Sequence, residues 1–225
     1  MIPIRDNLPT HRVPIINYLL IIANIVAFAW LWLASPAQQE TLVYEYAIIP
    51  SQFSSGIDTG NLRDVFTSMF MHAGWMHLIG NMLYLWIFGD NVEDRMGHIK
   101  YLLFYLFGGV FAAAAHIFVN PGSQIPTVGA SGAIAAVLGA YLILYPQSRV
   151  ATFIPLGFFM TLRTVPASIV LVVWFVLQFF EGVLSLGAGD MGGVAFWAHI
   201  GGFVVGVFIG LFFRKRSKAY PARAW

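Results

Sequence analysis

Residues 128–145 read VGASGAIAAVLGAYLILY, a run of glycine, alanine, aliphatic residues and tyrosine around a single serine, Ser131. A helix of ~20 apolar residues is long enough to cross the ~30 Å hydrocarbon core of a bilayer. A second run of this kind, residues 194–213, contains His199. Ionisable and strongly polar groups are costly in hydrocarbon and by default suggest function. The two runs therefore predict a membrane protein and mark two candidate functional residues.

Composition excludes an ordinary soluble domain. Charged residues make up 10% of the 225 residues, hydrophobic residues make up 59%, and the mean hydropathy is +0.75. Soluble domains carry about 25% charged residues. The chain has no cysteine, which excludes disulfides and thiolate chemistry. We expect an integral membrane protein that uses no cofactor and no metal.

Six apolar stretches have the length of membrane-crossing helices, which predicts an all-α, polytopic six-helix bundle. These spans use most of the chain, so we expect a single membrane domain over residues 1–225. The stretch Val150–Met160 is also apolar, but it is short and contains Pro155 and Gly157, so we interpret it as interfacial. The predicted spans are Ile15–Leu33, Met69–Phe88, Tyr101–Val119, Val128–Tyr145, Val165–Leu186 and Val194–Phe213.

The distribution of Lys and Arg predicts the orientation, because these residues are retained in short cytoplasmic loops. Six spans leave eleven of the twelve Lys and Arg residues on the side of both termini, with Arg63 opposite. We therefore expect a cytoplasmic N-terminal segment (1–14), an extracytoplasmic loop (34–68) and a basic cytoplasmic tail (214–225). The charges of that tail lie beside the membrane and favour lipid headgroups as partners over nucleic acid.

The candidate polar residues are predicted to lie at one depth. Ser131 and His199 each lie 14 residues above the inner end of their span, roughly 21 Å at 1.5 Å per residue. In the second span His77 occupies the same level, and Asn81 lies one turn lower on the same helical face. We expect these four groups to converge in the outer half of the bundle.

Small residues favour a close approach of the fourth and sixth spans. Ala135 and Gly139 follow Ser131 at a spacing of four, and the sixth span carries Gly202, Gly206 and Gly210 at the same spacing. Such faces let helix backbones pack closely in lipid. They are also routine in helix packing, so the glycines alone have a structural explanation.

The chemistry that suits this arrangement is nucleophilic catalysis. A serine hydroxyl is a poor nucleophile until a base accepts its proton, and imidazole titrates near neutral pH. Ser131 is therefore the candidate nucleophile and His199 the candidate base, with His77, Asn81 and the Ser131 amide as oxyanion donors. No acidic residue within a span obviously orients His199, so we infer a dyad. A structural alternative stays open, since an intramembrane serine can bond to a carbonyl one turn earlier, and His77 and Asn81 could pin the second span.

Three sequence motifs, one each in the second, fourth and sixth predicted spans, resemble the rhomboid family of intramembrane serine proteases. The segment that follows the first motif resembles the rhomboid connection between spans two and three. The motifs are His72-Ala73-Gly74-Trp75-Met76-His77-Leu78-Ile79-Gly80-Asn81, Val128-Gly129-Ala130-Ser131-Gly132-Ala133-Ile134 and Trp197-Ala198-His199-Ile200-Gly201-Gly202-Phe203, and the connecting segment is Phe88-Gly89-Asp90-Asn91-Val92-Glu93-Asp94. The resemblance implies a six-helix rhomboid core with Ser131 as nucleophile, His199 as general base, and His77 and Asn81 in the oxyanion hole. The chain departs from the family pattern at Leu62-Arg63, where the family has Trp-Arg, and at Ala135, where a tyrosine is frequent.

The resemblance implies single-pass transmembrane proteins as substrates, cut where their helix is locally unstable. A site that opens to the extracytoplasmic side of a bacterial cytoplasmic membrane fits the charge distribution and the absence of a transit peptide. Two other function classes stay open: a rhomboid-like protein that binds or escorts membrane clients without cutting them, and a proton-coupled transporter. The presence of both Ser131 and His199 favours the protease over the binder. The absence of apparent paired carboxylates and inverted repeats disfavours the transporter.

Overall fold

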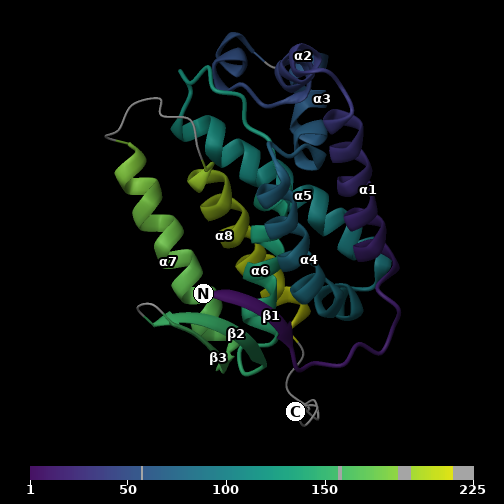
Figure 1. The fold of residues 1–225 in the computed structure, drawn as a ribbon, viewed down its shortest axis with the longest axis vertical. Coiled ribbons are helices and arrows are strands. Elements are labelled where there is room, and N and C mark those ends of the chain that lie inside the picture. The colour runs from purple at the N-terminus through teal and green to yellow at the C-terminus, as the bar shows by residue number, and fades with distance from the viewer. Residues whose placement is uncertain (57, 157–158, 187–193, 215–225) are drawn as a thin grey trace.

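The computed structural model describes residues 1–56, 58–156, 159–186 and 194–214, and most of them are helical (Figure 1). The predicted basic tail therefore lies outside the described residues, except for Arg214. In chain order the elements are β1 (Ile2–Asp6), α1 (Ile15–Trp32), α2 (Pro36–Tyr46), the 3₁₀ helix η1 (Pro50–Ser55), α3 (Thr59–Thr67), the 3₁₀ turn η2 (Ser68–Phe70), α4 (Trp75–Met96), α5 (His98–Val119), α6 (Ser131–Leu144), β2 (Arg149–Leu156), β3 (Phe159–Pro166), α7 (Ala167–Ser185) and α8 (Phe196–Phe213).

The prediction of a multi-pass membrane protein is confirmed. In the described part of the chain, four helices are long and apolar enough to cross a membrane, namely α1, α5, α7 and α8, and α6 is a shorter apolar helix of 14 residues. Helix α4 has 22 residues but carries charged side chains near its C-terminal end. The number of crossings and the orientation of the termini stay predictions.

Helix α4 begins and ends later than the predicted second span. It starts at Trp75 and continues to Met96, so the predicted connection after Phe88 forms its last turns. The charged residue Glu93 is tolerated in these last turns because its carboxylate has hydrogen-bond partners. Its side chain is 1% exposed and accepts hydrogen bonds from the backbone N–H groups of Ile16 and Asn17, at 3.0 and 2.7 Å. This carboxylate thus caps the first turn of α1, whose amides have no intrahelical acceptors.

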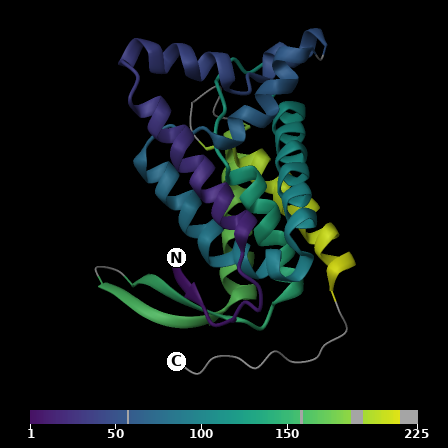
Figure 2. The ribbon, with the colours of Figure 1, turned by 90° about the vertical axis from the view of Figure 1, so that its right-hand side faces the viewer.

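The all-α prediction is wrong in one part, because the chain also forms a three-stranded antiparallel sheet in the order β1-β2-β3. The stretch predicted to be interfacial contains most of β2 and the first two residues of β3, and these strands pair with each other. Strand β1 pairs with β2 from Ile2 opposite Phe153 to Asp6 opposite Val150. Strand β2 contains β-branched residues that suit a pleated surface, and Val150 and Thr152 are fully buried. The sheet lies at the end of the bundle opposite α2 and α3 (Figures 1 and 2).

Helix α6 forms the centre of the bundle, and all its residues from Gly132 to Tyr141 are buried. The backbones of α6 and α8 are in direct contact, as the spacing of small residues predicts. A Cβ atom placed on Gly202 would lie 2.1 Å from the carbonyl oxygen of Gly132, and one on Gly206 would lie 2.0 Å from that of Ala136. Only glycine permits this approach, which brings the start of α6 beside the first turns of α8.

Candidate active site

The structure brings Ser131 and His199 together. Ser131 is the first residue of α6, and His199 lies in the first turn of α8, where its side chain is buried. The hydroxyl oxygen of Ser131 lies 2.7 Å from Nε2 of His199. This is hydrogen-bond distance for a hydroxyl that donates to an imidazole nitrogen. The two atoms have the geometry of a nucleophile and its base.

The turn before Ser131 depends on Gly129. Its φ of +136° lies in the region that side chains disfavour, and a Cβ there would come within 2.8 Å of Nε2 of His77. The amide of Gly129 donates to the carbonyl of Ser68 at 2.9 Å. Thr127, two residues earlier, exchanges backbone hydrogen bonds of 2.8 and 3.1 Å with Ile48. Backbone hydrogen bonds to Ile48 and Ser68 therefore fix the path of the chain that leads to Ser131.

His77 and Asn81 line the same cavity as Ser131 and His199, a space of about 520 Å³. The Nδ2 group of Asn81 is buried and has no hydrogen-bond partner among the described residues. Nδ1 of His77 accepts from the amide of Ala73 at 3.5 Å, which leaves the proton on Nε2. The cavity wall thus carries two donors and, in the first turn of α6, the amide of Ser131, which has no intrahelical acceptor.

Trp174 of α7 contacts His199, which the sequence analysis did not predict. Its ring lies 5.8 Å from the ring of His199, centre to centre, at an interplanar angle of 36°. Ala135, where the family pattern has a tyrosine, cannot provide such a contact. An aromatic ring from a different helix therefore covers the imidazole, and a tryptophan in an apolar span gives no sequence signal for this role.

Gln178, also on α7, is a site residue that the sequence analysis missed. Its side-chain oxygen contacts Nδ1 of His199, on the opposite side of the imidazole from Ser131. Its side-chain nitrogen donates to the carboxylate of Glu181 at 3.2 Å. A sequence signal was present, since Gln178 and Glu181 are strongly polar residues in a mostly apolar span.

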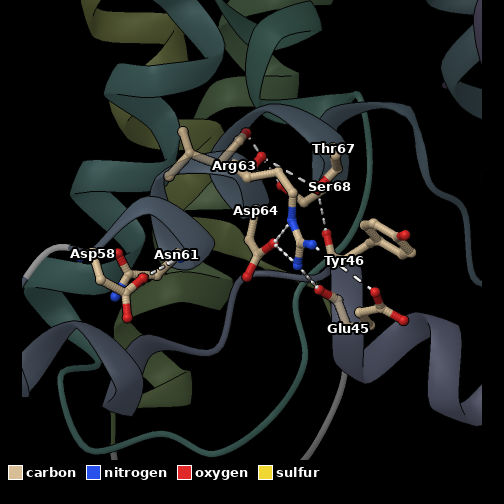
Figure 3. Close-up of polar contacts among 9 residues, drawn as sticks. Glu45, Tyr46, Asp58, Asn61, Arg63, Asp64, Thr67 and Ser68 are labelled. Atoms are coloured by element: carbon tan, nitrogen blue, oxygen red, sulfur yellow. Dashed lines mark hydrogen bonds and ion pairs between the residues drawn. The ribbon is translucent and has the colours of Figure 1, made fainter.

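Arg63 anchors the loop in which the Trp-Arg pair of the family reads Leu62-Arg63 (Figure 3). Its guanidinium donates to the carboxylate of Asp64 and to the carbonyl of Glu45 at 2.5 Å, and it lies 4.7 Å from the centre of the Tyr46 ring. The hydrogen bond to Asp64 raises the pKa of Arg63. These contacts join α2 to α3 although Leu62 is exposed.

No group of three or more His, Cys, Asp or Glu residues that could hold a metal ion occurs within the described ranges.

Comparison with known proteins gives a family match over most of the chain. The Rhomboid domain family matches residues 59–216. The chain is 32% identical over 200 residues to the rhomboid protease GluP of Bacillus subtilis, which covers 88% of this chain and 35% of that protein. It is 27% identical over 202 residues to the mitochondrial RHOMBOID-like protein 12 of Arabidopsis thaliana, covering 80% of this chain and 57% of the relative.

A human relative, the mitochondrial presenilin-associated rhomboid-like protein, is 29% identical over 140 residues, 61% of this chain and 35% of its own length. The chain thus spans between about a third and three fifths of the length of these relatives. The family match covers more than half of the chain and includes all four predicted site residues. The chain belongs to the rhomboid family.

Proposed function

We propose that this chain is an intramembrane serine endopeptidase that hydrolyses peptide bonds in or near the transmembrane segments of membrane proteins. The observation that carries the proposal is the 2.7 Å contact between Ser131 Oγ and His199 Nε2 beside a cavity of about 520 Å³. The homology to named rhomboid proteases supports the same activity.

In the proposed reaction Ser131 Oγ attacks the scissile carbonyl carbon while His199 Nε2 takes the hydroxyl proton. The carbonyl oxygen becomes an oxyanion, which Nε2–H of His77, Nδ2–H of Asn81 and the Ser131 amide stabilise by hydrogen bonds. The imidazolium then gives its proton to the leaving amine, and the new amino terminus departs. Water, activated by the same imidazole, hydrolyses the acyl-enzyme and regenerates Ser131.

The proposed topology has six crossings by α1, α4, α5, α6, α7 and α8, with both termini cytoplasmic. Pairing of β1 with β2 supports an even number of crossings between them, because paired strands lie on one side of the membrane. The ends of α4 and α8 also meet, since Arg95 Nε donates to the carbonyl of Phe213 at 2.8 Å. These contacts gather most of the described Lys and Arg residues at one end, which the positive-inside rule assigns to the cytoplasm.

With that orientation the cavity opens toward the extracytoplasmic side, and the proposed location is a bacterial cytoplasmic membrane. Single-pass proteins are the proposed substrates. A peptide bond inside a regular helix is shielded, so the segment must unwind locally to reach Ser131. Apolar residues such as Met76, Ile134 and Leu138 share the cavity wall with the polar groups and suit an unwound apolar segment.

The test is cleavage of a single-pass reporter by the purified chain in detergent or liposomes. We expect Ser131→Ala and His199→Ala each to lose cleavage, and Ser131→Ala also to lose labelling by a fluorophosphonate probe. Ser185→Ala is the matched control, because its hydroxyl donates to the carbonyl of Gly182 within α7 and does not reach the cavity. Wild-type cleavage by either dyad variant would reject the mechanism. Binding of the reporter without any cleavage by the wild-type chain would favour the client-binding alternative.

A further inference from the structure

We propose that Gln178 is a positioning residue for His199: its side-chain oxygen accepts the Nδ1 proton of the imidazole and so leaves Nε2 free to receive the proton of Ser131. This inference rests on the function proposed above and goes beyond it, because a dyad alone leaves the tautomer of its histidine undetermined.

The geometry comes from one face of α7. Trp174, Gln178 and Glu181 follow one another at spacings of four and three, so they lie on the same helical face. Trp174 covers the face of the imidazole, and Gln178 contacts its Nδ1 edge. Residues on the other faces, such as Leu177 and Phe180, are exposed at the surface of the bundle. Helix α7 therefore directs one amide toward the site and an apolar surface outward.

The hydrogen bond between Gln178 and Glu181 determines which group of the Gln178 amide faces His199. A carboxylate only accepts, so the NH₂ group of Gln178 must be the part that lies 3.2 Å from Glu181. The oxygen of the same amide then faces Nδ1 of His199, and an oxygen cannot donate. Nδ1 must therefore carry the proton of the neutral imidazole. Nε2 is left with a lone pair, which faces Ser131 Oγ at 2.7 Å.

Burial gives this contact its importance. His199 is 7% exposed, and the side-chain oxygen of Gln178 is the partner that the structure gives its Nδ1 atom, so loss of that oxygen leaves a buried donor without its acceptor. Without the amide oxygen, the imidazole can rotate or carry its proton on Nε2, and a protonated Nε2 cannot accept from Ser131. The second ring nitrogen of a functional histidine is commonly fixed by such a partner.

The test compares Gln178→Leu, Gln178→Glu and the control Leu177→Ala in the reporter assay. Gln178→Leu keeps a similar volume but offers no acceptor, so we expect kcat to fall roughly tenfold, equivalent to ~1.4 kcal/mol, with KM unchanged. Gln178→Glu restores an acceptor for Nδ1–H and should recover most of the lost kcat. Leu177→Ala changes an exposed apolar side chain beside Gln178 and should leave kcat unchanged.

A second measurement does not depend on activity. In protein labelled with ¹⁵N-histidine, the His199 signals can be assigned among the six histidines by their loss in His199→Asn. We expect the wild-type imidazole to be protonated on Nδ1, and Gln178→Leu to shift the signals toward the Nε2-protonated form. An unchanged tautomer together with unchanged kcat in Gln178→Leu would overturn the positioning role. If the wild-type chain shows the Nδ1 tautomer but cleaves nothing, the proposed function fails while the contact itself is upheld.

Discussion

Substitution of Gly202 by alanine tests whether the backbone contact between α6 and α8 sets the geometry of the site. The new Cβ would lie 2.1 Å from the carbonyl oxygen of Gly132, whereas ordinary contacts begin at 3.4 Å. Gly132 follows Ser131 directly, and Gly202 lies one turn after His199. Because packed interiors have little free space, the helices must separate locally by about 1.3 Å.

That displacement is large compared with the contact it disturbs. Ser131 Oγ and His199 Nε2 are 2.7 Å apart, so the same shift takes them to about 4 Å, outside hydrogen-bond range. A misplacement of ~1 Å can cost about 100-fold in rate. Forcing an extra carbon into a well-packed contact also costs ~1–3 kcal/mol of folding free energy. We therefore expect Gly202→Ala to lower kcat about 100-fold and to lower the thermal unfolding midpoint.

The assay is cleavage of the single-pass reporter, with thermal unfolding of the detergent-solubilised protein measured in parallel. Val204→Ala is the matched control, since Val204 is also on α8 but its side chain is 40% exposed at the bundle surface. We expect this control to keep wild-type cleavage. If Gly202→Ala cleaves at the wild-type rate with an unchanged midpoint, the close approach of the helices does not position the dyad and the reasoning is refuted.

Three further substitutions test separate parts of the structure. Asn81→Ala removes an unpaired donor from the cavity wall, and we expect kcat to fall about 100-fold with little change in KM; an unchanged kcat would remove Asn81 from the oxyanion hole. Trp174→Ala removes the ring that covers His199, and should lower kcat about threefold to tenfold while Trp174→Phe keeps most of it, since aromatic pairs contribute ~0.5–1.5 kcal/mol. Glu93→Ala removes the cap of α1 and should lower the free energy of unfolding by about 2 kcal/mol, as measured by denaturation. Glu93→Gln, which keeps one acceptor, should lose less, and equal stability of all three proteins would argue against the cap.

Hydropathy predicted most helix boundaries well, because apolar length is a local property of the sequence. The described ends of α1, α5, α6, α7 and α8 lie within about three residues of the predicted spans. Helix α4 differs because its C-terminal charges have partners in the protein, which a hydropathy argument cannot anticipate. Glu93 lies inside the fold and bonds to α1, a residue separation of 76 or more.

The pairing of β1 with β2 was not predicted because it is non-local. Strand β1 meets β2 only after more than 140 residues of intervening chain, so neither strand shows its partner in the surrounding sequence. The apolar stretch near Val150 alternates too weakly to separate a strand from an interfacial segment. The correct part of that prediction was that the segment does not form a further membrane-length helix.

The candidate site was predictable where its residues lie in motifs and not where they come from α7. Ser131, His199, His77 and Asn81 could be named from their spacing and from the depth argument, and they line one cavity. Trp174 and Gln178 act through a lateral contact between neighbouring helices. Gln178 and Glu181 mark a polar position on α7, but the sequence does not show which neighbouring helix that side of α7 meets.

The pairing of β1 with β2 also constrains how the protein is made. The first strand leaves the ribosome long before its partner, so it cannot pair with β2 while the six intervening α-helices are synthesised. An unpaired strand edge readily pairs with other chains. The sheet can therefore close only after β2 has been synthesised, and a chain that ends before Arg149 lacks the strand with which β1 pairs.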